Sequence, residues 1–215
     1  MKARLLAFSL VLLSAPLLAQ TPAATAPDTH KYSNPLGFSY VLVLPADWQV
    51  VDSQTASSQA KEKATQNATS EAEKKGVACT QIGLTARHLN PISAIVQVAL
   101  PYGCFGQQLA RDDLPGFGAG TAEGFKQNFD IGDPEAATYT LGSHHLWAER
   151  VHGTLKGQTD RHYTIEISCV LLGKAAVCWM TMAADDASLA IFEHGAVTLE
   201  DDPPAPLVPA GTFKQ

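Results

Sequence analysis

The residues in this chain that could most readily do chemistry are two histidines and a glutamate. His152 and His162 flank a polar stretch, Lys156–Asp160, which separates two apolar segments. If these segments pair as antiparallel strands, the two imidazoles lie near each other, and Glu166 shares the face of His162 because side chains alternate along a strand. Imidazole and carboxylate groups are metal ligands. This face is therefore a candidate site for a metal or for small-molecule chemistry.

The competing interpretation is that His152, His162 and Glu166 are polar side chains on the wetter face of a sheet. Tyr163 and Ile165 alternate with them and point to the opposite face. No further fixed ligand accompanies the three residues, and metal sites usually hold more protein ligands than this. We favour this interpretation and expect neither a metal nor a cofactor.

The four cysteines predict two disulfides. If residues 173–174 form a two-residue turn, Cys169 lies directly opposite Cys178, because both are equally distant from the turn. A glycine at the first position of such a turn suits the type II′ geometry. Counting outward from the turn, the two cysteines form a non-hydrogen-bonded pair, in which side chains approach most closely.

Cys79 and Cys104 are the second predicted pair. They flank the Asn90-Pro91 turn at similar distances and can bridge neighbouring strands. The alternative is four reduced, buried thiols, which an oxidising compartment disfavours. A zinc site needs closely spaced cysteine pairs, and this chain has none.

Other motifs give little support for catalysis. Gly116–Gly120 precedes an expected helix, but the dinucleotide fingerprint needs a further glycine at position 121, where Thr121 stands. The chain has neither a Gly-x-Ser-x-Gly elbow nor a His-Glu-x-x-His motif. We therefore expect a protein that is not an enzyme.

The N-terminus has the order of a secretory signal. Lys2 and Arg4 precede a largely apolar run, Leu5–Leu18, and the small residue Ala19 follows. We expect residues 1–19 to be cleaved as a signal peptide. The mature protein is then exported to the periplasm or the extracellular space.

The charge of the chain argues against nucleic acid as a partner. The full chain carries a net charge of −6, and without Lys2 and Arg4 it has 13 basic and 21 acidic residues, a net charge of −8. Phosphate backbones are bound by clustered Lys and Arg. No later apolar run is long enough to span a membrane after signal cleavage.

The remaining sequence predicts one domain with polar flanks. We expect a disordered leader over 20–30, a single domain over 31–200 and a Pro-rich disordered tail over 201–215. Alternating apolar residues predict strands over 37–44, 77–87, 92–101, 136–141, 145–154, 161–172 and 175–183.

Three segments have a helical pattern. Alanines recur every four residues within Ser53–Lys75, which makes a slowly winding stripe. Thr121–Phe129 is a short amphipathic helix. A last helix is expected after Asp185 or Asp186, with one apolar face made of Leu189, Phe192, Ala196 and Leu199.

The opening of the domain resembles the PsbP/DcrB-like superfamily. Its members often begin with a Gly-Phe strand followed by Leu-Pro-x-x-Trp, and this chain has Gly37-Phe38 and Leu44-Pro45-Ala46-Asp47-Trp48. The resemblance implies an α+β fold, an antiparallel β-sheet meander flanked by helices on both faces in an α/β/α sandwich. It implies no activity, because the superfamily includes photosystem accessory subunits, envelope proteins and a nuclear-transport regulator.

These observations together predict an exported, disulfide-stabilised, non-enzymatic binding or accessory protein of the cell envelope. Its partner would be an envelope protein whose identity the sequence does not specify. The alternative is an enzyme that binds a small molecule or a metal through His152, His162 and Glu166.

Overall fold

The computed structural model describes residues 28–51, 57–58, 61–62, 64–66, 68, 70–185, 188, 197–200, 202–203 and 208–209. Within them, a large antiparallel sheet has the order β12-β7-β8-β9-β10-β5-β4-β3, with β6 paired to β8, and a small sheet has the order β1-β2-β11. The strands are β1 (Asp28–Asn34), β2 (Phe38–Leu44), β3 (Gln49–Val51), β4 (Gln81–Leu89), β5 (Ile92–Pro101), β6 (Phe129–Ile131), β7 (Glu135–Leu141), β8 (His144–Leu155), β9 (Gln158–Leu172), β10 (Ala175–Ala183), β11 (Val197–Leu199) and β12 (Val208–Pro209).

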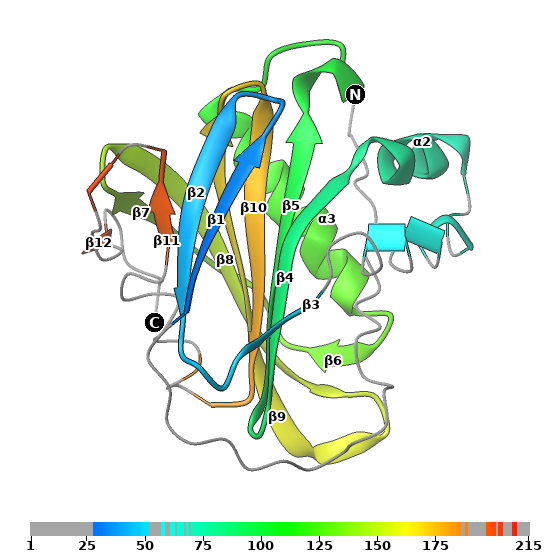
Figure 1. Ribbon diagram of the computed structural model, residues 1–215. Coiled ribbons are helices and arrows are strands. Elements are labelled where there is room, and N and C mark those ends of the chain that lie inside the picture. The colour runs from blue at the N-terminus through cyan, green and yellow to red at the C-terminus, as the bar shows by residue number, and fades with distance from the viewer. Residues whose placement is uncertain are drawn as a thin grey trace.

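The two faces of the large sheet are covered differently. The small sheet packs on one face, and helix α3 (Leu114–Phe125) packs on β8 and β9 from the other (Figure 1). Helix α2 (Glu71–Cys79) leads into β4, and two short 3-10 helices, η1 (Tyr102–Cys104) and η2 (Arg111–Asp113), precede α3. The antiparallel pairing is as predicted, but β10 pairs with the earlier strand β5, so that the large sheet joins two meanders, β3-β4-β5 and β7-β8-β9-β10. Helices on both faces are not seen in the described residues, because strands cover one of the faces.

Each face of the large sheet has its own apolar core. Between the sheets, alternate residues of β2 are buried, with Phe38, Tyr40, Leu42 and Leu44 each at most 3% exposed. The opposite side of β2 is only half-buried, although its sequence is also largely apolar. The second core lies under α3 and contains Phe125, Phe129 and the alternate positions of β9 and β10. Because β10 contributes to both cores, all of its residues are buried.

Both predicted disulfides are present. Cys169 pairs with Cys178 in the β9–β10 ladder and is bonded to it, as the position of the turn predicts. Gly173 adopts the positive φ, 51°, that this turn requires. The second bridge joins Cys79 to Cys104. It links the end of α2 to η1, just outside the two strands that we expected it to connect.

Several predicted boundaries are wrong near the start of the domain. β1 begins at Asp28, within the expected leader, and pairs along its length with β2. Its sequence has no apolar period, so the strand depends on this pairing and on stacking of Tyr32 against Tyr40. Helix α2 continues to Cys79, beyond Lys75, where the predicted helical segment ended, and β4 begins at Gln81 instead of Val77.

The predicted helices also differ from those observed. Gly116–Gly120 lies inside α3, which ends at Phe125, and Phe129 opens strand β6. A Cβ atom at Gly118 would overlap the Trp147 ring, so the glycine permits close packing of α3 on β8. Leu199 was expected on a last helix, but it is fully buried in β11 beside β2.

The predicted C-terminal tail makes specific contacts at the described positions. Val208–Pro209 pairs with β7, and Asp202 contacts the β7–β8 turn. Leu189, Phe192 and Ala196, and the predicted signal peptide over 1–19, lie outside the described residues. Among the residues that the structure describes, no helix is long and apolar enough to cross a membrane.

Candidate functional site

The two histidines of the predicted metal face lie on one side of the large sheet but on different rungs. His152 is opposite Thr164, and His162 is opposite Thr154. The His152 Nδ1 atom lies 3.1 Å from the Thr164 Oγ1 atom, within hydrogen-bonding distance. His162 is exposed at the end of the sheet where β9 begins. The strand pairing was therefore predicted correctly, and it makes the two histidines diagonal neighbours on one face of the sheet.

The Glu166 side chain forms an ion pair with Arg150. Its side chain is 1% exposed, and its Oε2 atom accepts hydrogen bonds from Arg150 Nη2 at 2.6 Å and Nε at 3.2 Å. Ser168 Oγ donates to its other oxygen at 3.1 Å. The expectation of a wet position for Glu166 is wrong, because alternation shows which residues share a face but not how deeply that face is covered. The Glu166 carboxylate and the Arg150 guanidinium therefore form a structural ion pair.

The residues described by the structure include no group of three or more His, Cys, Asp or Glu side chains placed to hold a metal ion. The absence of a metal at His152 and His162 stays a prediction.

An open cleft lies at the end of the large sheet where β9 begins. The β4–β5 turn and the first residues of β9 lie at this same end (Figure 1). The cleft encloses about 660 Å³ and is lined by Leu89, Asn90, Pro91, Ile92, Asp160, Arg161, His162, Tyr163 and Ala184. One of the three predicted candidates, His162, is therefore part of a concave surface with apolar and charged walls.

Contacts behind the β4–β5 turn hold this wall in place. His88 Nε2 lies 2.9 Å from Asp47 Oδ2, and the imidazole stacks on Trp48 with ring centroids 5.9 Å apart. Because Leu89 follows His88 directly, these contacts fix the direction in which the turn leaves the sheet. The Trp48 of the opening motif thus supports one wall of the cleft.

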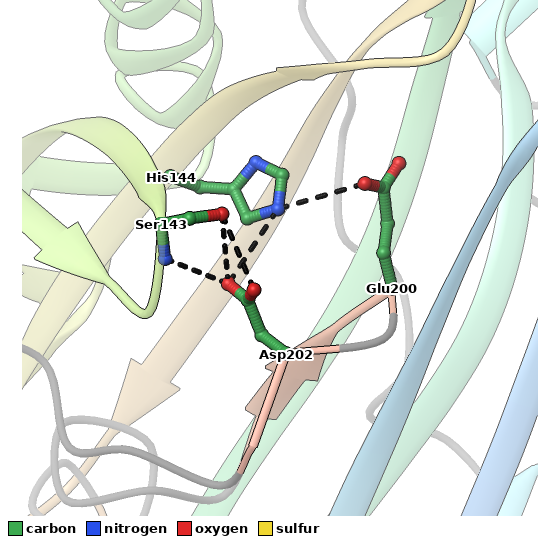
Figure 2. Close-up of polar contacts among 4 residues, drawn as sticks. All are labelled: Ser143, His144, Glu200 and Asp202. Carbon is green, nitrogen blue, oxygen red and sulfur yellow. Dashed lines mark hydrogen bonds and ion pairs between the residues drawn. The ribbon is translucent and has the colours of Figure 1, made fainter.

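A second polar cluster joins the C-terminal segment to the β7–β8 turn (Figure 2). Asp202 accepts hydrogen bonds from the Ser143 backbone amide at 2.7 Å and from its Oγ at 3.1 and 3.2 Å. His144 Nε2 lies 3.6 Å from Glu200 Oε2 and 3.7 Å from Asp202 Oδ2. A Cβ atom at Gly142 would overlap the Asp202 carboxylate. The turn can therefore accommodate the Asp202 side chain only because position 142 is a glycine.

This cluster has the residue types of a hydrolytic triad but not its connections. The Ser143 hydroxyl donates to the Asp202 carboxylate, whereas a nucleophilic serine donates to histidine. The cluster therefore fastens residues 200–202 to the sheet. Sequence reasoning missed it because residues near Leu199 were expected to be helical, which hid their proximity to His144.

The Asp202 contacts predict an acid-sensitive contribution to stability. The hydrogen bond from the Ser143 amide lowers the pKa of Asp202 from its ordinary value of 3.8, and the Ser143 hydroxyl and His144 lower it further. A lowered folded-state pKa stabilises the fold above the unfolded pKa, and this contribution disappears as pH falls through the folded value. We expect Asp202→Asn to be less stable than wild type at neutral pH, with the difference closing below pH 3.8.

Urea unfolding at several pH values measures this difference. Asp133→Asn, at an exposed position, is the matched control and should leave the pH dependence unchanged. A difference for Asp202→Asn that stays constant down to pH 2 would contradict the role of its charge.

A buried carboxyl under α3 predicts the opposite pH dependence. Glu149 is 4% exposed, its Oε1 has no hydrogen-bond partner among the described residues, and burial raises its pKa from the ordinary 4.5. A raised folded-state pKa makes a contribution that is complete below the unfolded pKa and is lost as pH rises through the folded value. We expect Glu149→Gln to become progressively more stable relative to wild type as the pH rises above 4.5.

Denaturant unfolding between pH 4 and 8 tests this expectation, with exposed Glu71→Gln as the control. An equal stability difference at all pH values would show that Glu149 ionises as freely in the folded protein as in the unfolded chain.

Comparison with known proteins finds similarity only in three dimensions. No protein-family model and no curated protein sequence matches the chain. Among solved structures, the solution structure of cyanobacterial PsbP (CyanoP) from Synechocystis sp. PCC 6803 is 13% identical, with a TM-score of 0.41, and the alignment covers 81% of this chain and 91% of that chain. The crystal structure of LpqN, involved in cell envelope biogenesis of Mycobacterium tuberculosis, is 14% identical, with a TM-score of 0.39 and coverages of 83% and 93%.

A PsbP structure is thus among those found. Both similarities concern the fold, and neither identifies a ligand or an activity of this chain.

Proposed function

We propose that this chain is an exported, non-enzymatic binding or accessory protein of the cell envelope, and that it binds through the cleft between the β4–β5 turn and the start of β9. The observation that carries the proposal is the cleft itself, a concave surface of about 660 Å³ with apolar and charged walls. The two disulfides support export, because such bonds persist in oxidising compartments.

The enzymatic alternative receives no support from the geometry of its three residues. Glu166 is closed off by Arg150, while His152 contacts Thr164 and His162 lines the cleft. A general base and its partner must lie within hydrogen-bonding reach of one reacting group. These three side chains do not share such a point.

Capture of partners from an envelope extract tests the proposal. Wild type and Leu89→Asp serve as baits, because Leu89 is 46% exposed in the cleft. Val50→Asp is the matched control, since Val50 is 41% exposed on β3 and does not line the cleft. We expect a partner that wild type and Val50→Asp retain and Leu89→Asp loses. Equal retention by all three baits would contradict binding at the cleft.

Export has its own test, which is N-terminal sequencing of protein from the native host. The signal pattern predicts a mature chain that starts at or near Gln20. An intact Met1 on membrane-bound protein would contradict cleavage.

A further inference from the structure

The β4–β5 wall of the cleft presents apolar side chains to solvent. Leu89 is 46% exposed, Pro91 is exposed and Ile92 is half-buried. Ala184, which directly follows β10, is also exposed and lines the same cleft. Apolar side chains around a concavity are a favourable surface for the apolar part of a ligand, because binding removes both from water.

The β9 wall presents charge. Asp160, Arg161 and His162 are consecutive, and all three are exposed. The Arg161 guanidinium makes no hydrogen bond or ion pair with any residue in the described part of the chain. Arginine remains charged at all physiological pH values, and its planar fork of donors matches the oxygens of a carboxylate or a phosphate.

The two fixed charges of this wall are opposite in sign, Asp160 and Arg161. Arg161 offers several donors in one plane, with which an anionic headgroup can pair. Asp160 would attract a cationic headgroup, which is why the test below includes a cationic probe. The net charge of −6 for the whole chain repels anions at long range. Salt screens this repulsion over about 8 Å at physiological ionic strength, so that the local contacts decide binding.

We propose that the cleft binds a small anionic amphiphile, an alkyl chain that ends in a carboxylate or a phosphate. The chain would lie on Leu89, Pro91 and Ile92, and the headgroup would pair with Arg161. This inference rests on the proposed binding function of the cleft and adds the chemistry of the ligand. The cleft volume of about 660 Å³ is within the range of sites for small ligands.

Calorimetric titration of the exported, disulfide-bonded chain with four monomeric probes tests the proposal. Octanoate and octyl phosphate carry the anionic headgroups, octyl glucoside is neutral and octylammonium is cationic. We expect the better anionic probe to bind about tenfold more tightly than the neutral and cationic probes, which corresponds to one charge-assisted contact. Tighter binding of octanoate points to free fatty acids as the source, and tighter binding of octyl phosphate points to phospholipid headgroups. No binding of either anion, or equal binding of octyl glucoside, would overturn the proposal.

Two variants locate the headgroup. Arg161→Gln should weaken binding of the anionic probe about tenfold and leave octyl glucoside unchanged. Lys174→Gln is the matched control, because Lys174 is an exposed cation in the turn at the other end of β9. Equal losses in the two variants, or no loss in Arg161→Gln, would contradict the assignment.

The two experiments separate the proposed function from the proposed ligand chemistry. If an envelope partner is captured in a Leu89-dependent manner and no anionic probe binds, the proposed function stands and only the ligand chemistry is wrong. If anionic probes bind at Arg161 and no partner is captured, the partner is a small molecule that the extract experiment cannot retain.

Discussion

Arg150→Leu is expected to lower the free energy of unfolding by about 3–5 kcal/mol, the usual result of breaking a buried ion pair from one side. Glu166 is 1% exposed and its Oε2 atom receives two hydrogen bonds from Arg150. Without the guanidinium, Ser168 Oγ is a neutral donor that offsets only a small part of the uncompensated charge.

Urea unfolding at neutral pH measures this loss, and a double variant identifies its cause. Arg150→Leu combined with Glu166→Leu removes both charges and should recover most of the stability. Arg161→Leu, at an exposed arginine of β9, should change stability by less than about 0.5 kcal/mol. A double variant no more stable than Arg150→Leu would show that lost packing, and not the buried charge, accounts for the effect.

Removal of the disulfides is expected to have the second largest effect. In the chain-entropy model, a bridge with a sequence separation of 25, Cys79–Cys104, contributes about 3.5 kcal/mol, and one with a separation of 9, Cys169–Cys178, contributes about 2.5 kcal/mol. The β9–β10 ladder already fixes the register around the shorter loop. We therefore expect Cys79→Ala to destabilise the protein more than Cys178→Ala.

Thermal and urea unfolding of the two single variants decide the order, with non-reducing peptide mapping as the control for correct pairing. Cys169 and Cys178 are both at most 4% exposed, whereas Cys79 and Cys104 are only partly buried. A larger loss in Cys178→Ala would show that packing of the buried sulfur atoms outweighs loop closure.

The sheet could be predicted where turn chemistry and apolar runs agree. Gly173 marks a two-residue turn between two apolar runs, and this fixes the register that brings Cys169 opposite Cys178. The β4–β5 hairpin around Asn90-Pro91 was predictable for the same reason. In these cases the local signal and the tertiary pairing point to one structure.

The small sheet could not be predicted in full, because two of its strands lack a local signal. β1 is polar, with Tyr32 as its only aromatic residue, and it is a strand because β2 pairs with it. β11 has three residues, and Leu199 also fits the helical spacing that we assigned to it. Short strands at the edge of a sheet are defined by their neighbours, which sequence periodicity does not reveal.

The candidate site was predictable only in part. The strand pairing placed His152 and His162 on one face. The burial of the Glu166 carboxylate could not be predicted, because it is compensated by an ion pair with Arg150, and an arginine in the sequence does not indicate a buried partner. The cleft joins a turn at Leu89 to residues around Arg161, more than 70 positions later in the chain. Because β10 and β5 separate β9 from β4 in the sheet, no local motif connects these two walls.

Hydrogen–deuterium exchange of the disulfide-bonded chain, with and without envelope extract, tests most directly the claim that the cleft is the binding surface. We expect slower amide exchange upon addition of extract in peptides that contain residues 89–92 and 160–163, which form the two walls. Exchange around Gly173 and Lys174, in the turn at the far end of β9, should not change. Unchanged exchange in both walls, whether or not other segments become protected, would contradict that claim.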